Sequence, residues 1–540
     1  MAMACISATD LTVAFDPKPP VFQALDVHLS AEPVALIGPN GAGKTVLAEC
    51  LAGIRIPTAG QVQHQVPVAF LPQQAAEQHD ARTVAAFLGV EAALAALARL
   101  LAGEGQVDDL SILNDRWTLQ DDLQAQLAQF QLPADILSAP VSALSGGQRT
   151  RLHLLQLSRL PDTYLILDEP TNHLDQGGRQ WLADWIMQRS GGTLVITHDQ
   201  SLLASFSQLL ELREGRLQRH GQGFAEYRQS RAQLLEKAQH DKQHARQTLK
   251  RERQQQQLER ERHEQRAAKG RAKARKGDMP KILLDARKDR SEATGGRIAQ
   301  KHQTALDAEQ QRLQTAESVL GRENPLAFPL TEPAPISGCL LALEAVRLPW
   351  VENAEPLDWQ VMSGERWWLR GTNGSGKSTL LSVISGAIEP VSGDVQRRGT
   401  LLRLDQHLTL LTPNQSALAN FRRLNPGWSN AAYRDRLAQV RLRGDLALQP
   451  VSQLSGGEQL KVALACSLMG PEAAQLILLD EPDNHLDLES QTLLAEVLSQ
   501  YQGTLIVVTH SEPMAQAMLL DRVQTLGRAE PGLYADASAG

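Results

Sequence analysis

The sequence lacks several features that define other classes of protein. Only four cysteines occur among its 540 residues, Cys5, Cys50, Cys339 and Cys466, and none of them forms a CxxC pair. This excludes a disulfide framework or a zinc module and fits a reducing cytosol. Charges interrupt the apolar stretches well short of the roughly 18 residues of a membrane span. No basic region leads into an apolar run at the start, as it would in a signal peptide. We therefore expect a cytoplasmic protein.

The overall composition is that of a soluble globular chain, but its charge is unevenly distributed. Hydrophobic residues make up 42% and charged residues 21%, which argues against a wholly disordered or fibrous chain. The net charge is −7, yet residues 231–300 contain 20 Lys/Arg and 10 Asp/Glu, which leaves −17 for the rest. A basic segment between two acidic parts indicates an electrostatic contact surface.

The chain contains an internal duplication. Four motifs occur twice in the same order: GPNGAGKT at 38–45 and GTNGSGKS at 371–378, LSGGQ at 144–148 and LSGGE at 454–458, YLILDEPTNHLD at 164–175 and LILLDEPDNHLD at 476–487, and LVITHD at 194–199 and IVVTHS at 506–511. Such repetition at a fixed order indicates two copies of one domain.

The offsets between the copies define three blocks. Lys44 and Lys377 lie 333 residues apart, whereas Asp168 and Asp480 lie 312 apart, so the first copy holds about 20 extra residues before its LSGGQ motif. Residues near 85–131 are rich in Ala and Leu at helical spacing, which predicts a short helical insertion there. We expect an α/β fold with one domain at 1–225, a second at 326–540, and a linker at 226–325.

The linker is expected to be a long, basic, α-helical hairpin. Residues 226–276 contain no proline and one glycine, Gly270, and strong helix formers dominate. The large aliphatic residues there, Leu234, Leu235, Leu249 and Leu258, do not follow the heptad spacing of a coiled-coil seam. Gly277 and Pro280 predict the tip of the hairpin near residues 277–281, where the apolar sequence MPKILL begins at Met279. A solvated spacer with balanced ion pairs remains an alternative.

Each GxxxxGK[ST] motif follows a short apolar run and precedes a helix-like one, as a phosphate-binding loop requires. The glycines let backbone N–H groups surround the phosphates, and the helix N-terminus adds positive potential. Lys44 and Lys377 are expected to contact the β- and γ-phosphates, and Thr45 and Ser378 to offer hydroxyls to Mg²⁺. The expected phosphate-binding residues are Gly38, Asn40, Gly41, Gly43, Lys44, Thr45, Gly371, Asn373, Gly374, Gly376, Lys377 and Ser378.

The repeated apolar runs predict buried strands that deliver acidic groups and histidines to these loops. Asp168 and Asp480 end two such runs and would serve the metal. The residues that follow them, Glu169 and Glu481, are expected to orient and polarise a water for attack on the γ-phosphate. The predicted catalytic set is completed by two histidines at the ends of later runs, His198 and His510.

With these motifs in this order, the sequence resembles the ATP-binding cassette ATPases over nearly the whole chain outside the linker. In that family two cassettes pack head to tail, so that each ATP lies between one phosphate loop and the other cassette's LSGG signature. The resemblance implies a first site formed by Lys44, Thr45, Gln73, Asp168, Glu169, His198, Ser455, Gly456 and Gly457. It implies a second site formed by Lys377, Ser378, Gln406, Asp480, Glu481, His510, Ser145, Gly146 and Gly147.

The resemblance also assigns accessory roles at the two sites. Mg²⁺, bound with ATP, would be held by Thr45, Gln73, Ser378 and Gln406. Asp175 and Asp487 match the loop that links the two sites. Phe15 and Trp350 are candidates for stacking on adenine.

Two complete cassettes, EPTNHLD or its near copy in each, and a charged helical linker are similar to the ABC-F family. This resemblance implies an ATPase that binds the ribosome, with the linker of residues 226–325 reaching rRNA and tRNA, and a monomeric chain whose own cassettes pair. Basic charge suits polyphosphate contact. Residues 231–300 contain no aromatic residue, so contact through backbone and shape is favoured over base stacking.

Two other classes remain open. One is the ATP-binding subunit pair of a membrane transporter, although such a pair needs no basic hairpin. A DNA-repair or chromosome-structuring ATPase would place its coiled coil inside a cassette, whereas here the large insertion lies between cassettes. One departure from the repeat bears on mechanism: Asp483 stands where the first copy has Thr171. A carboxylate there would raise the pKa of Glu481 or disturb the water, which predicts unequal hydrolysis with neither site inactive.

Overall fold

The computed structural model has a mixed α/β fold. It describes residues 5–15, 19–73, 75, 80–274, 300, 303–304, 306–317, 319, 328, 330–334, 336–351, 355–405, 408–484 and 486–527. The chain divides into two compact units, one formed by Met1–Phe224 with Leu326–Gly540 and the other by Ala225–Pro325. Among the described helices, none is long and apolar enough to cross a membrane.

The first cassette contains two sheets. Its strands are β1 (Ile6–Val13), β2 (Phe22–Leu29), β3 (Val34–Ile37), β4 (Ala59–His64), β5 (Val68–Leu71), β6 (Tyr164–Asp168), β7 (Thr193–Ile196), β8 (Leu209–Arg213) and β9 (Arg216–His220). The central sheet has the order β5-β6-β7-β3-β8-β9 and is parallel except for the β8–β9 pair. The strands β3, β6 and β7 are buried along their whole length, because a parallel sheet is covered on both faces. A smaller antiparallel sheet has the order β2-β1-β4.

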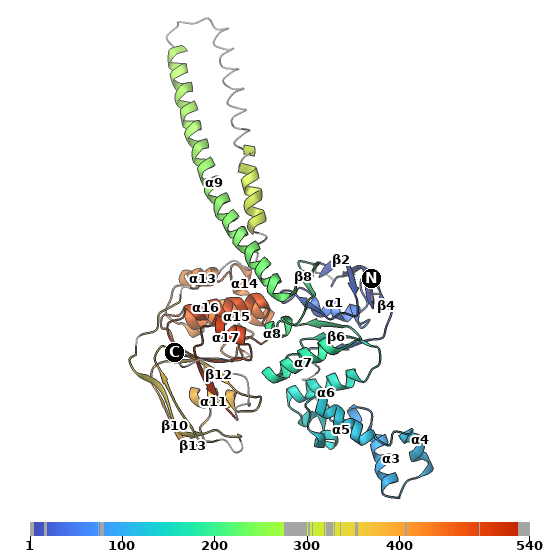
Figure 1. Cartoon of the computed structure of the whole chain (residues 1–540). Helices are drawn as coiled ribbons and strands as arrows, with labels where there is room; N and C mark the ends of the chain where they lie inside the picture. Colours follow the sequence, from blue (N-terminus) through green and yellow to red (C-terminus); the bar gives the residue numbers. More distant parts are fainter. Residues whose placement is uncertain are drawn as a thin grey trace, which may run out of the picture. The chain divides into compact units, whose positions relative to one another are not determined.

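Helices lie beside the sheets of the first cassette, except that α3 and α4 extend away from them (Figure 1). They are α1 (Lys44–Leu51), α2 (Val84–Phe87), α3 (Glu91–Leu101), α4 (Val107–Leu113), α5 (Leu119–Gln129), α6 (Gly146–Ser158), α7 (Gln176–Gln188) and α8 (Gln200–Leu203), with short 3₁₀ segments at Ala134–Ser138 and Val141–Ala143.

The second cassette repeats this arrangement. Its strands are β10 (Cys339–Arg347), β11 (Leu357–Met362), β12 (Arg366–Arg370), β13 (Ser392–Arg397), β14 (Leu401–Leu404), β15 (Leu476–Asp480), β16 (Thr504–Val508) and β17 (Arg522–Thr525). The central sheet is parallel in the order β14-β15-β16-β12-β17, and the antiparallel sheet has the order β11-β10-β13. The helices are α11 (Lys377–Ser385), α12 (Ala417–Leu424), α13 (Asn430–Gln439), α14 (Asp445–Leu448), α15 (Gly456–Leu468), α16 (Leu488–Gln500) and α17 (Glu512–Ala517), with a 3₁₀ segment at Val451–Gln453.

The extra residues of the first cassette form helices where the sequence predicts an insertion. Four helices, α2 to α5, lie between β5 and the signature, whereas the second cassette has three there, α12 to α14. Helices α3 and α4 are joined by an ion pair between Arg99 and Asp109. Helix α3 is rich in Ala and Leu, which favours helix formation. Helix α4 has acidic residues in its first turn, which suits the positive end of the helix dipole.

In the other unit, α9 (Gly223–Ala274) is one uninterrupted helix of 52 residues, as expected from its composition. A helical stretch at 306–317 supplies its partner, since Glu317 pairs with Arg246 at 3.1 Å and lies 3.8 Å from Lys242. The expected tip at 277–281, and MPKILL with it, lies outside the described residues.

The less exposed residues of α9 include residues other than the large aliphatic ones. From residue 231 onward they are 231, 235, 238, 239, 242, 245, 248, 249, 252 and 256. All but 239 and 248 are spaced alternately by four and three residues, a spacing that places side chains on one face of a helix. Ala238, Ala245 and Leu249 are buried, whereas Leu234 and Leu258 are exposed. The sequence reasoning counted only large aliphatic residues and overlooked the alanines.

Candidate functional site

The two phosphate loops leave the middle of each central sheet and enter a helix. In the first cassette the loop follows β3, and α1 begins at Lys44. Gly38 has φ of 150°, and a Cβ there would lie 2.2 Å from the carbonyl oxygen of Leu212, so only glycine fits. The same holds at Gly371, where a Cβ would lie 2.6 Å from the carbonyl oxygen of Leu526. The loop geometry is thus imposed by the neighbouring strand and is the same in both copies.

The two lysines lie folded over their loops. Lys44 Nζ donates to the carbonyls of Gly38 and Pro39 at 2.7 and 3.0 Å. Lys377 Nζ donates to the equivalent carbonyls of Gly371 and Thr372 at 2.8 and 3.0 Å. Burial lowers the pKa of both ammonium groups, while the nearby carboxylates act in the opposite direction. A buried ammonium group held at the helix N-terminus is suited to an anionic ligand such as phosphate.

A hydroxyl and a carboxylate meet beside each lysine. Thr45 Oγ1 donates to Asp168 Oδ2 at 2.7 Å, and Ser378 Oγ donates to Asp480 Oδ1 at 3.1 Å. Asp168 ends β6 and Asp480 ends β15, so the sheet edge places each carboxylate next to the loop. These oxygen atoms are the hard ligands that Mg²⁺ prefers, so the residues fit the metal.

The structure describes one of the two glutamines expected to complete the metal sites. Gln73 is exposed, and Gln406 lies outside the described residues. Within the described ranges no three His, Cys, Asp or Glu side chains gather as a metal cluster. A magnesium ion bound chiefly through ATP and one hydroxyl would not require such a cluster.

Each predicted glutamate lies beside its predicted histidine. Glu169 Oε1 lies 3.8 Å from His198 Nε2, and Glu481 Oε1 lies 3.3 Å from His510 Nε2. Both glutamates have left-handed backbones, with φ of 49° and 46°, which is uncommon for a side chain of this size and is often found at functional sites. Both ring nitrogens of His198 are buried without a hydrogen-bond partner. Such unpaired buried groups fit a site that receives phosphate oxygens.

The two glutamates have opposite electrostatic environments. Burial and the neighbouring Asp168 raise the pKa of Glu169 to about 8. Burial also acts to raise the pKa of Glu481, but His510, Lys377 and Arg179 outweigh it and lower that pKa to about 2. The expectation that Asp483 raises the pKa of Glu481 is therefore wrong, because three neighbouring positive or hydrogen-bonding groups dominate.

The signature motifs begin helices. Ser145 caps α6 and Ser455 caps α15, each in a reciprocal capping box with the residue three positions later. Gly147 faces the chain at His173, since a Cβ would lie 2.8 Å from its carbonyl oxygen. Gly457 faces Ser490, whose Oγ would lie 2.4 Å from a Cβ. Both glycines are therefore closely packed against neighbouring atoms.

The structure brings the signature of the first cassette together with the phosphate loop of the second. A cleft of about 350 Å³ is lined by both motifs and by the second catalytic pair. Its predicted members are Ser145, Gly146, Gly147, Trp350, Asn373, Gly374, Gly376, Lys377, Ser378, Glu481 and His510. Asn373 Nδ2 also donates across the interface to the carbonyl of His173 at 2.7 Å. Trp350 thus lies where a base could stack, and it is 80% exposed.

The other loop and signature also meet. Asn40 N donates to Asp487 Oδ2 of the second cassette at 2.8 Å. A Cβ on Gly456 would lie 3.9 Å from Asn40 Nδ2. Phe15, the other adenine candidate, lies under Arg55, with 5.4 Å between the guanidinium carbon and the ring centre.

The sequence reasoning missed Arg179, the fourth residue of α7. It lines the cleft with Glu481 and His510 although it belongs to the first cassette. A comparison of the copies at the 312-residue offset would have found it, because Gln491 stands at the equivalent position.

Comparison with known proteins identifies the class. A family model described as ABC transporter matches residues 24–172 and 354–484. The chain belongs to the ATP-binding cassette family, with two cassettes in tandem, and its relatives are of the ABC-F type. The cassette domains indicate an ATPase.

The relatives cover most of the chain. It is 30% identical over 504 residues to a probable ATP-binding protein YheS of Haemophilus influenzae, covering 88% of this chain and 72% of that protein. Of the protein with the same name from Escherichia coli K12, this chain spans 58%. It is 28% identical over 516 residues to ABC transporter F family member 4 of Arabidopsis thaliana, covering 88% of this chain and 67% of that protein.

A solved structure confirms the fold. An archaeal ribosome recycling factor, determined in complex with a ribosomal stalk protein, aligns with a TM-score of 0.57, covering 97% of this chain and 88% of that chain. At 18% identity this likeness establishes the tandem-cassette fold alone.

Proposed function

We propose that this protein hydrolyses ATP at two composite sites between its own cassettes and couples each cycle to binding the ribosome in the cytoplasm. The observation that supports the catalytic part is the cleft where Lys377, Glu481 and His510 of one cassette meet Ser145 and Gly147 of the other. Cross-cassette bonds at Asn40 and Asn373 support pairing within a monomeric chain.

The residues divide the reaction among them. Loop amides, the two lysines and the signature helices bind the phosphates and neutralise their charge. The predicted ligands of Mg²⁺ are Thr45, Ser378, Gln73 and Gln406, and the ion would offset further phosphate charge. Glu169 or Glu481 accepts a proton from water while the water oxygen attacks the γ-phosphorus. The bond from that phosphorus to the bridging oxygen breaks, and ADP and inorganic phosphate form.

The histidines are suited to hold the γ-phosphate. Burial and the charge of Lys44 lower the pKa of His198 to about 3. His198 is therefore neutral at pH 7, and one ring nitrogen donates while the other accepts. In this role it orients the phosphate and the attacking water and exchanges no proton with the solvent.

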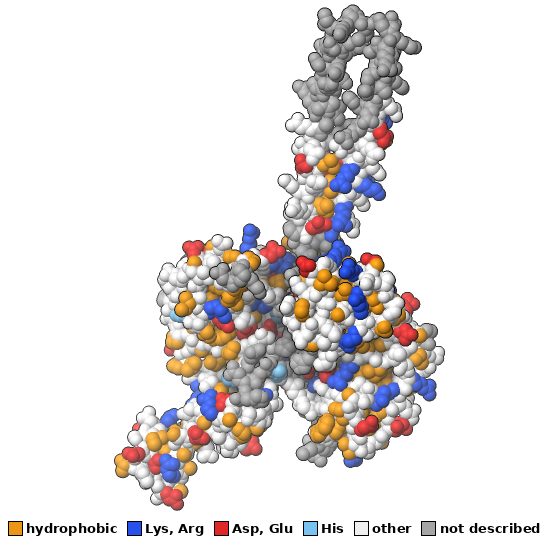
Figure 2. Space-filling model, turned by 180° about the vertical axis from the view of Figure 1, so that it is seen from behind, with side chains coloured by type: hydrophobic (Ala, Val, Ile, Leu, Met, Phe, Trp, Pro, Cys, Tyr) orange, Lys and Arg blue, Asp and Glu red, His pale blue; other side chains and the backbone are white. Residues whose placement is uncertain are grey.

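The basic helix supports the ribosomal partner. Helix α9 contains 14 Lys/Arg against 7 Asp/Glu. Blue side chains follow the described part of this helix in Figure 2, and Lys250, Arg251 and Arg253 are exposed there. An exposed row of positive charge of this density suits the phosphates of rRNA and tRNA. Membership of the ABC-F type supports the same partner.

The test is co-sedimentation with ribosomes of an E169Q/E481Q variant, which is expected to bind ATP without turning it over. We expect capture with ATP and little without it. Replacing Lys250, Arg251 and Arg253 by Gln should weaken capture by about tenfold or more at moderate salt, because three phosphate contacts are lost.

A matched variant controls for net charge. It replaces Arg216, Arg219 and Arg398, which are exposed on the cassettes, and should leave capture unchanged. No capture with ATP, in protein shown to bind the nucleotide, would overturn the ribosomal part. Capture together with membranes would then support a transporter subunit.

A further inference from the structure

The interface beside the second ATP site contains charged side chains where the other interface has neutral ones. Four positions related by the 312-residue offset differ in this way. The charged set is Arg179, Asp199, Asp483 and Glu512, and its neutral counterparts are Gln491, Ser511, Thr171 and Gln200. The cassettes therefore meet through two chemically different interfaces, although the motifs around both are the same.

At the neutral positions amide hydrogen bonds join the two cassettes, and an ion pair between Arg213 and Glu489 at 2.5 Å lies beside them. Gln491 Nε2 donates to the carbonyl of Leu486 at 3.2 Å and, across the interface, to that of His198 at 3.4 Å. Gln200 Nε2 donates to Gln491 Oε1 at 3.2 Å, which also joins the two cassettes. Gln491 is buried. These bonds join the segment around His198 in the first cassette to helix α16 of the second.

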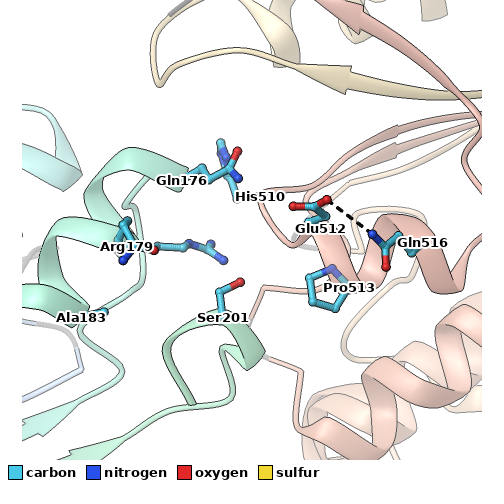
Figure 3. Close-up of a pocket in the computed structure, with 9 residues that line it drawn as sticks. Gln176, Arg179, Ala183, Ser201, His510, Glu512, Pro513 and Gln516 are labelled. Atoms are coloured by element: carbon cyan, nitrogen blue, oxygen red, sulfur yellow. Dashed lines mark hydrogen bonds between the residues drawn. The ribbon is translucent and has the colours of Figure 1, made fainter. Parts of the chain in front are cut away.

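At the charged positions the equivalent bond within one cassette is kept, but a cleft separates the two cassettes. Arg179 Nε donates to the carbonyl of Leu174 at 3.1 Å, as Gln491 does to Leu486. Its Nη1 donates to Asp199 Oδ2 at 2.5 Å, within the same cassette. Glu512 accepts from Gln516 on its own helix at 3.4 Å. A cleft of about 320 Å³ separates the cassettes here, lined by Arg179, Glu512 and His510. Figure 3 shows Arg179 and Glu512 on opposite walls.

Asp483 adds a buried carboxyl group to the second cassette. Its Oδ2 accepts from Thr509 Oγ1 at 2.8 Å, but its Oδ1 is buried without a hydrogen-bond partner in the described structure. Its counterpart Thr171 instead lies 3.4 Å from Thr197, hydroxyl to hydroxyl. A buried carboxylate requires a compensating charge. Burial raises the pKa of Asp483, and the positive charge of Arg179 acts in the opposite direction.

We propose that Arg179 is a positioning residue that the first cassette supplies to the second ATP site. As that site closes, the guanidinium pairs with Glu512 and compensates Asp483. This pairing holds helix α7, and the signature of the same cassette, against the loop that contains Glu481 and His510. The inference rests on the proposed ATPase function and adds that the same pair of positions is ionic at one site, Arg179 with Glu512, and neutral at the other, Gln491 with Gln200.

A double-mutant cycle tests the pairing. R179Q and E512Q should each lower both the affinity for ATP and the single-turnover hydrolysis rate by about tenfold, as expected for loss of a charge-assisted bond. The double variant R179Q/E512Q should be no worse than either single one, because two glutamines reproduce the neutral pair of the other interface. Losses that multiply to about a hundredfold would overturn the proposal.

Controls separate positioning from folding. R179K, which keeps the charge, should restore part of the rate. R189Q removes a positive charge just beyond the end of the same helix and should change nothing. R179Q also leaves Asp199 unpaired, so R179Q/D199S, which copies Gln491 and Ser511, should match R179Q in rate with an unfolding midpoint near that of the wild type. A rate restored to the wild-type value by D199S would overturn the role of Arg179 toward the second cassette.

The readouts also distinguish this inference from the proposed function. ATP affinity can be measured without hydrolysis. If the protein binds ATP but does not hydrolyse it, coupling between R179Q and E512Q in affinity supports the inference while the ATPase proposal fails. If hydrolysis is normal and the two effects multiply, the inference fails and the ATPase proposal stands.

Discussion

The two composite sites contain the same motifs, but their glutamates lie in different electrostatic environments. At the first site Glu169 lies beside Asp168 and a buried, neutral histidine, and its pKa is raised to about 8. At the second, Glu481 lies among His510, Lys377 and Arg179, and its pKa falls to about 2. The difference arises because the histidine lies closer to the glutamate at the second site, 3.3 Å against 3.8 Å, and because Arg179 adds a positive charge from outside the motifs. A duplicated sequence motif therefore does not guarantee two equivalent catalytic groups.

The largest expected effect distinguishes the glutamates in catalysis. At pH 7 Glu481 is ionised and able to accept a proton, whereas Glu169 is mostly protonated in this state. We expect E481Q to remove most steady-state ATP turnover, and E169Q/E481Q to lower it by at least about a hundredfold, the usual contribution of a general base. E169Q alone should retain a substantial part. Phosphate release from each variant measures this, and equal losses in the two single variants at pH 7 would contradict the comparison.

The glycines of the two signature motifs are expected to differ in how strongly an added side chain lowers the stability of the fold, which is a smaller effect. A Cβ at Gly147 meets a backbone carbonyl at 2.8 Å, whereas a Cβ at Gly457 meets the Ser490 hydroxyl, which can rotate away. G147A should therefore lower the free energy of unfolding by about 1–2 kcal/mol and G457A by less, because only the first forces the backbone to shift. Denaturant unfolding without nucleotide provides the measurement. A larger loss in G457A would show that the Ser490 side chain is held fixed.

The smallest effect is a pH dependence of stability without nucleotide. The raised pKa of Glu169 means that the folded state favours its protonated form, so its contribution to stability is complete below pH 4.5 and is lost as pH rises through about 8. The lowered pKa of Glu481 stabilises the fold above pH 4.5, and this contribution is lost as pH falls toward about 2.

Glutamine variants should reveal the two opposite signs. At pH 8.5 E169Q should raise the free energy of unfolding and E481Q should lower it, each by on the order of 1 kcal/mol. Both changes can be followed by denaturant unfolding at pH 5.5 and pH 8.5. If both variants change the free energy of unfolding in the same direction at pH 8.5, the two glutamates lie in similar environments.

The sequence by itself determined the fold class, the tandem duplication, the family and the partners of each loop within a cassette. Repeated motifs at nearly constant offsets have a single interpretation, and glycines such as Gly38 fix local backbone geometry. Strand runs ending in Asp168 and Asp480 suffice to place those carboxylates beside Thr45 and Ser378, because the parallel strands of one sheet end at the same edge. These features follow from the order of residues within short segments of the sequence.

Only the tertiary structure decided which charges face each other across the cassettes. The field at Glu481 depends on Arg179, which is about 300 residues distant in sequence, and the prediction based on nearby Asp483 had the wrong sign. The packing of α9 likewise uses Ala238 and Ala245, because the close approach of a second helix selects small residues. Electrostatic and packing energies depend on distance in space and on burial, and neither quantity follows from position along the chain.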